Sequence, residues 1–556
     1  MTTLSAQFSI LDYVLFAIVF VVSLAIGLYC GVKVKGKSTV NEYLFGGKKM
    51  NIIPVGFSLA ATTITGSATI GQSMEVYAYG PHNWMHLVIT PIWSLAIHYI
   101  FLNVFYDLQL MSTFTYLEMR FDRSVKNFAS ALYVISGVFV IPLTIYVPAL
   151  SFQEVSGINL HIIAVITGLL CIWYTAIGGI KAVVWTDVFQ CVLILISAIV
   201  IIIVGLSSVG GVEKVFTALQ RGERLPIPKT SIDLETRGSV WAYLFSTTFV
   251  LLYTFGLSQS AVQRYVSLST IQNAKKAIWV QASLVEVILL LQLFIGAIIY
   301  TAYENCDPLT SGLVKKVDQV FALFVQEKAS LFPGFNGIFI AGVFAAGLST
   351  TSTILNSISG TIYLDFLSKR MKSSSEATIS RTMKILVAIV GVIGIASICL
   401  IEKLGTVFAI TIQCFTISTV GVFGLFISGM VFPRTNSKGA KCGVAVSMLV
   451  VGFLIIGGLN KTPDPTLPLR VDGCDISNSM NSTAFSNSET VVSRNLNIHW
   501  IFRINFQYHC IIGLIINIIT GVIISALTGG NKVEDERLLV NFLRKNAPRE
   551  NLLSVN

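Results

Sequence analysis

Long apolar runs recur along the whole chain, and they restrict the fold more than any other feature of the sequence. Runs of about 20 residues, the length that crosses a bilayer as an α-helix, number about thirteen. The 556-residue chain is 54% hydrophobic and only 12% charged, whereas a soluble protein has roughly a quarter of its residues charged. A membrane β-barrel would alternate apolar and polar residues, but these runs are continuous. The sequence therefore predicts an all-α membrane protein with about 13 transmembrane helices.

Basic residues gather in short loops between alternate spans, a pattern that sets the orientation of a membrane protein. The first span, 11–31, is followed by a run of lysines that we place in the cytoplasm. We therefore expect an extracellular N-terminus, a cytoplasmic C-terminus and insertion in the plasma membrane. The net charge of +10 lies mostly in these inner loops. Nothing in the sequence indicates a nucleic-acid partner.

The longer loops, near 208–238, 303–335 and 459–508, fall outside in this orientation. Asn481-Ser-Thr483 in the last of them is a glycosylation sequon, so Asn481 is a candidate glycosylation site. Cys306 and Cys474 lie in separate outer loops, where oxidation is permitted, and a disulfide between them is a hypothesis. The tail after Gly530 is short and charged, and we expect it to form a cytoplasmic helix.

One apolar span, 341–357, is crowded with hydroxyl groups. Serines and threonines bond back to their own helix and also suit close helix packing in lipid, so most of these residues have a purely structural explanation. Ser349 and Thr350 are different, because adjacent hydroxyls beside the carbonyl of Ala346 offer a hard cation several neutral oxygens. The pattern indicates a sodium site, provided that a second helix supplies free carbonyls.

The second span contains a candidate for that helix. Its middle, 60–71, combines glycines, β-branched residues and hydroxyls and is a poor continuous helix. Irregular backbone at membrane depth is tolerated only where it faces protein or a water-filled cavity. A break here would free the carbonyls of Ala61 and Ile64. The seventh span, 241–260, has a similar polar interruption, and two interrupted helices in matching places of two halves indicate a transporter site.

Four motifs resemble those of the sodium/solute symporter family: YTAIGGIKAVVWTDVFQ at 174–190, QSAVQRY at 259–265, NCDP at 305–308 and GLSTTST at 347–353. They are most similar to its branch of monocarboxylate, multivitamin and iodide cotransporters, and the likeness covers about 11–528. The resemblance implies a LeuT-type fold, with two inverted five-helix repeats and flanking helices.

That resemblance divides the chain into five parts. Residues 1–49 are an N-terminal flanking helix with a basic inner loop. Residues 50–207 are a first inverted repeat, and 208–432 are a second inverted repeat with outer loops. Residues 433–528 are two C-terminal flanking helices with the glycosylatable loop, and 529–556 are a cytoplasmic tail.

The resemblance also implies roles for individual residues. The main sodium site would use the carbonyls of Ala61, Ile64 and Ala346 and the hydroxyls of Ser349 and Thr350. Asp187 would serve sodium release, the alternative being that it only fixes a helix end. Arg264 belongs to a motif at a cytoplasmic helix end and has a structural interpretation.

The substrate pocket implied by the same resemblance is lined by Ser67, Ala68, Thr69, Tyr253 and Phe255. Hydroxyls and the N–H groups of a broken helix hold an anion without a buried arginine. The chain departs from its anion-transporting relatives at Ala78, where they have an arginine in a Glu-x-Tyr-Arg-Tyr-Gly stretch.

Glu286 falls near the middle of the eighth span and has no counterpart in the pattern of the family. Two explanations stay open for it: a carboxyl group packed against a neighbouring helix, or a member of a proton or cation path.

These observations predict a symporter, not an enzyme. No phosphate-binding loop or nucleophile motif is present. We expect a sodium-coupled secondary active symporter, with Na+ as the coupling ion, that imports a small organic anion, such as a monocarboxylate or a vitamin like biotin or pantothenate. The alternatives are a sodium-coupled sugar or inositol carrier and a sodium-dependent sensor or channel on the same fold.

Overall fold

The protein is described here from a computed structural model. The structure describes residues 8–34, 39–225, 228–329, 332–399, 407–458, 461, 464, 466–474, 498–530, 533 and 535–544, with the side chains of 33, 34 and 407–414 left out. The candidate glycosylation site, Asn481, lies outside these ranges.

The described residues form helices and no strands, which confirms the all-α prediction. Nine helices in this part of the chain are long and apolar enough to cross a membrane, or ten if one bent pair is a single span. The figure of thirteen stays a prediction. The long helices include α1 (Ile10–Val34), α8 (Arg123–Ser156), α9 (Leu160–Val209), α13 (Ile271–Ala302), α16 (Glu376–Ala396), α18 (Val407–Val431), α19 (Ser437–Gly457) and α22 (His509–Leu527).

Helix α9 contains 50 residues, which at 1.5 Å per residue is about 75 Å, far longer than one bilayer crossing. It is interrupted at Gly179, where φ is 56° and ψ is −153°. Glycine is required at this turn, because a Cβ would lie 2.7 Å from the carbonyl oxygen of Tyr43 and because φ is positive. α9 is therefore two helices that meet at a sharp turn.

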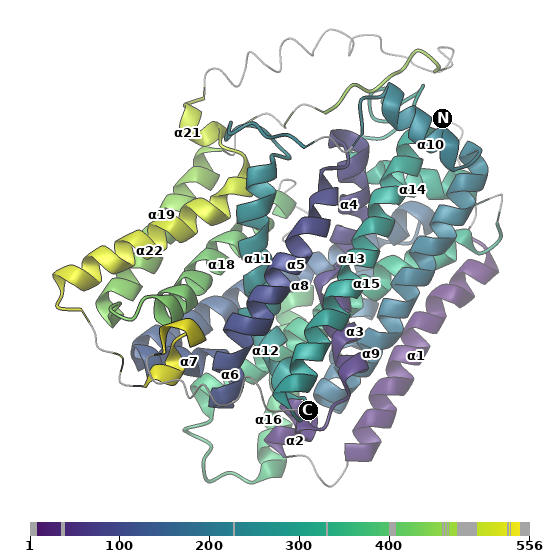
Figure 1. The fold of residues 1–556 in the computed structure, drawn as a ribbon. Helices are drawn as coiled ribbons and strands as arrows, with labels where there is room; N and C mark the ends of the chain where they lie inside the picture. The colour runs from purple at the N-terminus through teal and green to yellow at the C-terminus, as the bar shows by residue number, and fades with distance from the viewer. Residues whose placement is uncertain are drawn as a thin grey trace, which may run out of the picture.

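Helix α15 (Phe335–Thr361) runs through the centre of the bundle (Figure 1) and packs against α9, α8, α1 and α4 (Gly66–Tyr79). All its residues are buried except Ile338 and Ile354, which are partly buried. Small residues let its neighbours approach. A Cβ on Gly347 would lie 2.5 Å from the carbonyl oxygen of Thr144 on α8. The hydroxyl-rich span is thus the core of the molecule.

The two ends of the bundle carry different short helices. α10 (Val212–Arg221) and α14 (Val317–Lys328) lie at the upper end in Figure 1, whereas α2 (Val40–Phe45) and α7 (Thr113–Arg120) lie at the lower end. The helices of the loops predicted to be outside therefore share one end, and those of the basic loops share the other.

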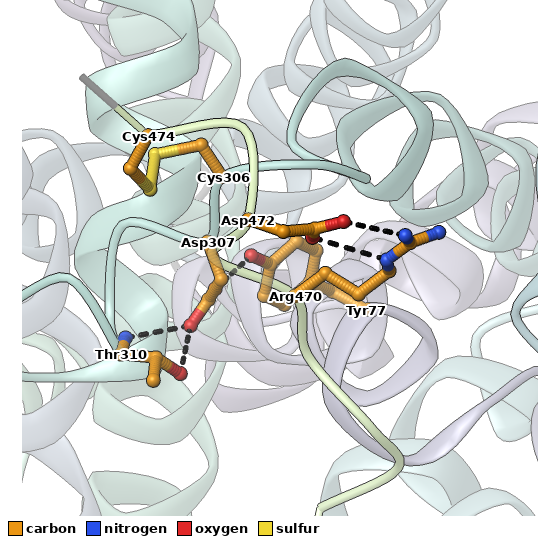
Figure 2. Close-up of a disulfide and its surroundings, with 7 residues drawn as sticks. All are labelled: Tyr77, Cys306, Asp307, Thr310, Arg470, Asp472 and Cys474. Atoms are coloured by element: carbon orange, nitrogen blue, oxygen red, sulfur yellow. Dashed lines mark hydrogen bonds and ion pairs between the residues drawn. A yellow bond between two sulfur atoms is a disulfide. The ribbon is translucent and has the colours of Figure 1, made fainter. Parts of the chain in front are cut away.

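A disulfide joins Cys306 and Cys474 at the upper end, between the loop after α13 and the segment 466–474 (Figure 2). Asp307 anchors the same place, since its N–H donates to the carbonyl of Arg470 at 2.8 Å and its carboxylate accepts the hydroxyl proton of Tyr77 on α4. The segment after α19 is thereby held over the C-terminal end of α4.

The tail differs from the expected helix. Its described residues form two single 3₁₀ turns, η9 (Glu536–Leu538) and η10 (Asn541–Leu543), separated by extended backbone. Leu538, Leu539 and Val540 are buried against the bundle. Their contacts with the rest of the protein hold this segment in a shape that its local sequence does not reveal.

Candidate sodium and solute site

The second span is broken, as the sequence predicts. α3 (Ile52–Thr63) ends at Thr63, and α4 begins at Gly66 after a bend of 62°. Ile64 and Thr65 have extended backbone at the break, and the hydroxyl of Thr65 caps α4 by accepting the N–H of Ala68 at 3.0 Å. The last carbonyls of α3 therefore lack the usual partner four residues further on, and that of Ala61 accepts the N–H of Ile64 at 3.3 Å instead.

Two hydroxyls of α15 meet those carbonyls. Ser349 donates to the carbonyl of Ala61 at 3.0 Å and to that of Ala346 at 3.0 Å. Thr350 donates to the carbonyl of Thr62 at 3.1 Å and to that of Ala346 at 3.2 Å. Three carbonyl oxygens and two hydroxyl oxygens from α3 and α15 thus converge in one buried place, which we call the oxygen cage.

The chemistry of the oxygen cage suits a small hard cation. All five groups are neutral oxygens, the type that hard cations prefer. A hydroxyl has one proton to donate and two lone pairs to offer, so Ser349 and Thr350 each have a lone pair for a cation while their protons bond a neighbouring carbonyl. No cluster of three or more His, Cys, Asp or Glu side chains suited to a transition metal occurs among the described residues.

The structure brings together four of the five predicted sodium ligands, namely Ala61, Ala346, Ser349 and Thr350. The carbonyl of Thr62 contacts Thr350, and no such contact joins the carbonyl of Ile64 to the described hydroxyls of α15. The side chain of Ile64 packs in the same small apolar cluster as Ala61 and Ala346. Thr62 is a cage residue that sequence reasoning missed.

Asp187 lies within reach of the same helix break. Its side chain is fully buried on α9, and its Oδ2 accepts the hydroxyl proton of Ser58 on α3 at 2.6 Å. Its other oxygen, Oδ1, has no hydrogen-bond partner among the described residues. The carboxylate is therefore only partly satisfied, and it faces α3.

Arg264 on α12 (Gln259–Val266) completes this network. Its Nη2 lies 3.2 Å from Asp187 Oδ2, and its Nε donates to Ser58 at 2.7 Å. Nη2 also donates to the hydroxyls of Thr62, at 3.3 Å, and of Thr353 on α15. The guanidinium thus joins α3, α9, α12 and α15, and Thr62 belongs both to this network and to the oxygen cage.

The residues predicted to line a substrate pocket do not form one group. Ser67 bonds Thr65 at 2.8 Å, and Thr69 donates to the backbone of its own helix at 3.1 Å. Thr69 also borders an enclosed cavity of about 10 Å³, which holds one water at most. Ala68 is partly buried on the same turn.

The two aromatic residues of the seventh span point to other helices. Phe255 packs edge-on against Trp93 on α5 (His86–Ala96), with ring centroids 4.5 Å apart. Tyr253 packs near Phe423 on α18, with ring centroids 6.1 Å apart. No hydrogen bond or ring contact between described residues joins this pair to Ser67, Ala68 or Thr69.

An arginine from a distant segment approaches the position where relatives have one in the Glu-x-Tyr-Arg-Tyr-Gly stretch. The guanidinium of Arg237 makes two hydrogen bonds to Glu75, at 2.8 and 2.6 Å, and lies 3.8 Å from the ring centre of Tyr79. Ala78 itself is buried, and its carbonyl accepts the N–H of Leu467 at 2.9 Å. The loop before the seventh span therefore supplies a cation to the C-terminal end of α4.

Glu286 lies on α13, and neither oxygen of its carboxyl group has a hydrogen-bond partner among the described residues. Thr90 on α5 is close to it. No Lys, Arg or His of the described part of the chain forms an ion pair with Glu286.

Comparison with known proteins gives one consistent family. Residues 43–447 match the family model described as "Sodium:solute symporter family". The chain is 31% identical over 534 residues to sodium-coupled monocarboxylate transporter 2 of Bos taurus, covering 95% of this chain and 86% of that protein. It is 30% identical over 535 residues to a putative sodium-dependent multivitamin transporter of Drosophila melanogaster, covering 95% and 88%.

Solved structures agree with the fold. A Na+-coupled sialic acid symporter in a substrate-bound, outward-open state superposes with a TM-score of 0.78 at 23% identity, covering 95% of this chain and 99% of that one. Mhp1, a transporter of the nucleobase-cation-symport-1 family, superposes with a TM-score of 0.52 at 12% identity, covering 90% and 98%.

Proposed function

The chain belongs to the sodium:solute symporter family, and from that premise we propose that it imports a small organic anion together with Na+ by alternating access. The observation that carries this proposal is the meeting of Ser349 and Thr350 with the carbonyls of Ala61 and Thr62 at the break of the second span. Monocarboxylate and multivitamin transporters are among the relatives that resemble the chain over most of its length. A carboxylate-bearing substrate is the simplest chemistry that both groups share.

The oxygen cage would hold Na+ between α3 and α15. An ion there contacts both helices, so it stabilises the arrangement in which they meet and disfavours arrangements in which they separate. Coupling arises because Na+ binds one arrangement of the helices more tightly than the other. Since linkage between two binding sites is symmetric, bound Na+ raises the affinity for substrate by the same factor as bound substrate raises the affinity for Na+. An inside-negative potential favours entry of each positive charge by about 2.3 kcal/mol per 100 mV.

Asp187 and Arg264 would control sodium release. The guanidinium of Arg264 bonds the hydroxyl of Thr62, whose carbonyl is part of the oxygen cage, so it lies next to the cage on the side of Asp187. An ion that leaves in this direction meets first the arginine and then a carboxylate. We propose that sodium passes when this ion pair opens and the carboxylate is free to receive it.

The substrate would bind beside the cage, where the first turn of α4 presents N–H groups and hydroxyls. Ser67, Ala68 and Thr69 lie on that turn, and Tyr253 and Phe255 are the facing residues in the proposed alignment. Because Tyr253 and Phe255 pack against α18 and α5 and not against this turn, the pocket would form by movement of the seventh span relative to α4.

We place the protein in the plasma membrane, with the disulfide and the loops containing α10 and α14 outside and the tail inside. The five-part division, with inverted repeats at 50–207 and 208–432, is part of the same proposal. So is glycosylation of Asn481.

Uptake into proteoliposomes tests the function directly. The purified protein is reconstituted, and an inward Na+ gradient is imposed in the presence of labelled lactate, biotin, iodide or myo-inositol. We expect concentrative, Na+-dependent uptake of lactate or biotin and none with K+ in place of Na+. Uptake of myo-inositol instead would identify a sugar carrier, and Na+ currents without accumulation of any solute would identify a sensor or channel.

A further inference from the structure

The described part of the tail, 535–544, is folded against the end of the bundle that carries α7. Leu538 is 4% exposed, Leu539 is 5% exposed and Val540 is fully buried. Exposed tails of this length are ordinarily poorly ordered unless contacts tie them down. The burial of three consecutive aliphatic residues therefore calls for a specific partner surface.

That surface is a groove formed by α6 (Leu102–Leu108), α7 and α18. The hydroxyl of Tyr116 on α7 donates to the carbonyl of Leu538 at 2.9 Å, and the N–H of Val540 donates to the carbonyl of Met430 on α18 at 3.2 Å. Leu538 and Val540 belong to the same apolar core as Tyr116 and Met430. The tail thus contacts two helices through both its backbone and its side chains.

An ion pair joins the tail to the third helix, α6. Arg544 Nη1 lies 3.0 Å from the carboxylate of Asp107 on α6. The same guanidinium donates to the carbonyl of Leu539 at 3.0 Å and to that of Arg537 at 3.1 Å. Arg544 therefore holds the two turns of the tail together and at the same time ties them to α6.

The groove lies where α7 contacts the end of α18, two helices that are distant in the sequence. Arg120 on α7 donates from Nε to the carbonyl of Gly429 at 2.9 Å, and from Nη2 to those of Phe432 and Pro433 at 3.1 and 3.0 Å. These carbonyls lie in the last turn of α18 and in the two residues that follow it. The tail covers this contact between α7 and α18 and bonds Met430 there, so the tail and Arg120 hold the same pair of helix ends.

We propose that the segment 535–544 is an internal ligand of this groove, which holds the ends of α6, α7 and α18 together and slows their separation. In the proposed division, α6 and α7 belong to the first repeat and α18 to the second, and alternating access moves such parts relative to one another. A ligand that contacts all three helix ends stabilises only the arrangement in which they meet. It shifts the equilibrium between the two arrangements by the difference in its affinity for them. Release of the tail makes inner opening more frequent.

Amide hydrogen exchange of the full chain in nanodiscs tests the docking, independently of which solute is carried. In the Arg544→Asp variant, the rate of amide exchange at 538–540 and 429–433 should rise by about tenfold. The ion pair with Asp107 is lost, so local opening of these segments costs less free energy. The double variant Asp107→Arg with Arg544→Asp restores the ion pair in reverse, so exchange at both segments should be slower than in Arg544→Asp alone. It should stay above the parent rate, because the bonds from Arg544 to the carbonyls of Leu539 and Arg537 are still lost. Phe542→Ala is the control, because that side chain is 67% exposed on the same tail.

A chain that ends at Gly530 tests the consequence without disturbing the groove. Exchange at 429–433 should rise as in Arg544→Asp, and Na+-driven uptake of the transported member of the solute panel should become at least about threefold faster, as expected when a ligand of one state is removed. Parent exchange rates in Arg544→Asp, or an unchanged uptake rate in the shortened chain, would overturn the proposal. Loss of uptake by the parent protein with the exchange pattern intact would instead count against the proposed function alone.

Discussion

The hydroxyl of Ser349 donates to the carbonyl of Ala61 at 3.0 Å across the boundary between α15 and the broken second span. The two residues are 288 positions apart in the chain. The carbonyl of Ala61 lies at the end of α3, where it accepts the N–H of Ile64 at 3.3 Å and has a second lone pair for Ser349. Thr350 makes the same kind of contact with Thr62. Neutral oxygens from two helices therefore share one site, and the position of each helix depends on the other.

We expect that Asp187 and Arg264 depend on each other. Asp187→Asn leaves a buried guanidinium unpaired, and Arg264→Gln leaves a buried carboxylate unpaired, so each should lower the free energy of unfolding by roughly 3–5 kcal/mol. The double variant should lose clearly less than the sum of the two. Thermal unfolding in detergent measures all three, and additive losses would show that the pair is not coupled.

The proposed release path adds a kinetic expectation for Asp187→Asn. The maximal rate of uptake should fall by about tenfold, which corresponds to about 1.4 kcal/mol of barrier, while the Na+ concentration for half-maximal uptake should change little. A merely structural carboxylate would lower the amount of folded protein without altering the rate per folded molecule. Rates normalised to folded protein distinguish the two roles.

The disulfide should stabilise the loop after α13 and the segment 466–474. Cys306→Ser or Cys474→Ser opens a loop of 168 residues. Each should lower the free energy of unfolding by roughly 2–5 kcal/mol. Peptide mapping under non-reducing conditions should recover the linked pair. The exposed free cysteine Cys442 provides the control, since Cys442→Ser should not change the melting temperature. Recovery of Cys306 and Cys474 as free thiols would refute the bridge.

Gly347 should not accept a side chain. In Gly347→Ala the new Cβ would lie 2.5 Å from the carbonyl of Thr144 and 2.8 Å from Pro148, so α15 and α8 would have to separate, at a cost of about 1–3 kcal/mol. Gly452→Ala on α19 is the matched control, because no atom of another described residue lies within 4 Å of the place that its new methyl group would take. Equal melting temperatures for the two variants would contradict the close packing.

Glu286→Gln separates the two explanations for that residue. An isolated ion is costly to bury, and no described cation pairs with the carboxyl group, so we expect the isosteric amide to be tolerated. Uptake should then keep its dependence on pH and on Na+. A shifted pH profile would instead place Glu286 on a proton or cation path.

The sequence predicted the helical half of the site better than the broken half. Ala346, Ser349 and Thr350 lie within one turn of a continuous helix, so their relative positions follow from helical geometry. Which carbonyl of the second span faces them depends on the backbone angles at Ile64 and Thr65, which no residue type specifies. Thr62 was therefore missed, and Ile64 was named in its place from the expected helix break and from the resemblance to the family.

Two other features depended on long-range contacts that local patterns do not encode. Arg264 was interpreted as a structural residue at a helix end, but its long side chain reaches Asp187, which lies 77 positions away in the chain. The tail was expected to form a helix, yet Val540 bonds Met430 and the backbone forms two separate 3₁₀ turns. Both outcomes follow from tertiary packing, which overrides local propensity.

The double variant Ser349→Ala with Thr350→Ala tests the central claim most directly. It removes both hydroxyl ligands and leaves the helix intact. Ser359→Ala is the matched control, because Ser359 is buried on the same helix and bonds only its own backbone in the described structure. The measurement is the Na+ concentration for half-maximal uptake. We expect it to rise by at least about tenfold, the effect of losing about 1.4 kcal/mol of binding, with the control unchanged. Uptake that still follows external Na+ as in the parent protein would contradict the oxygen cage.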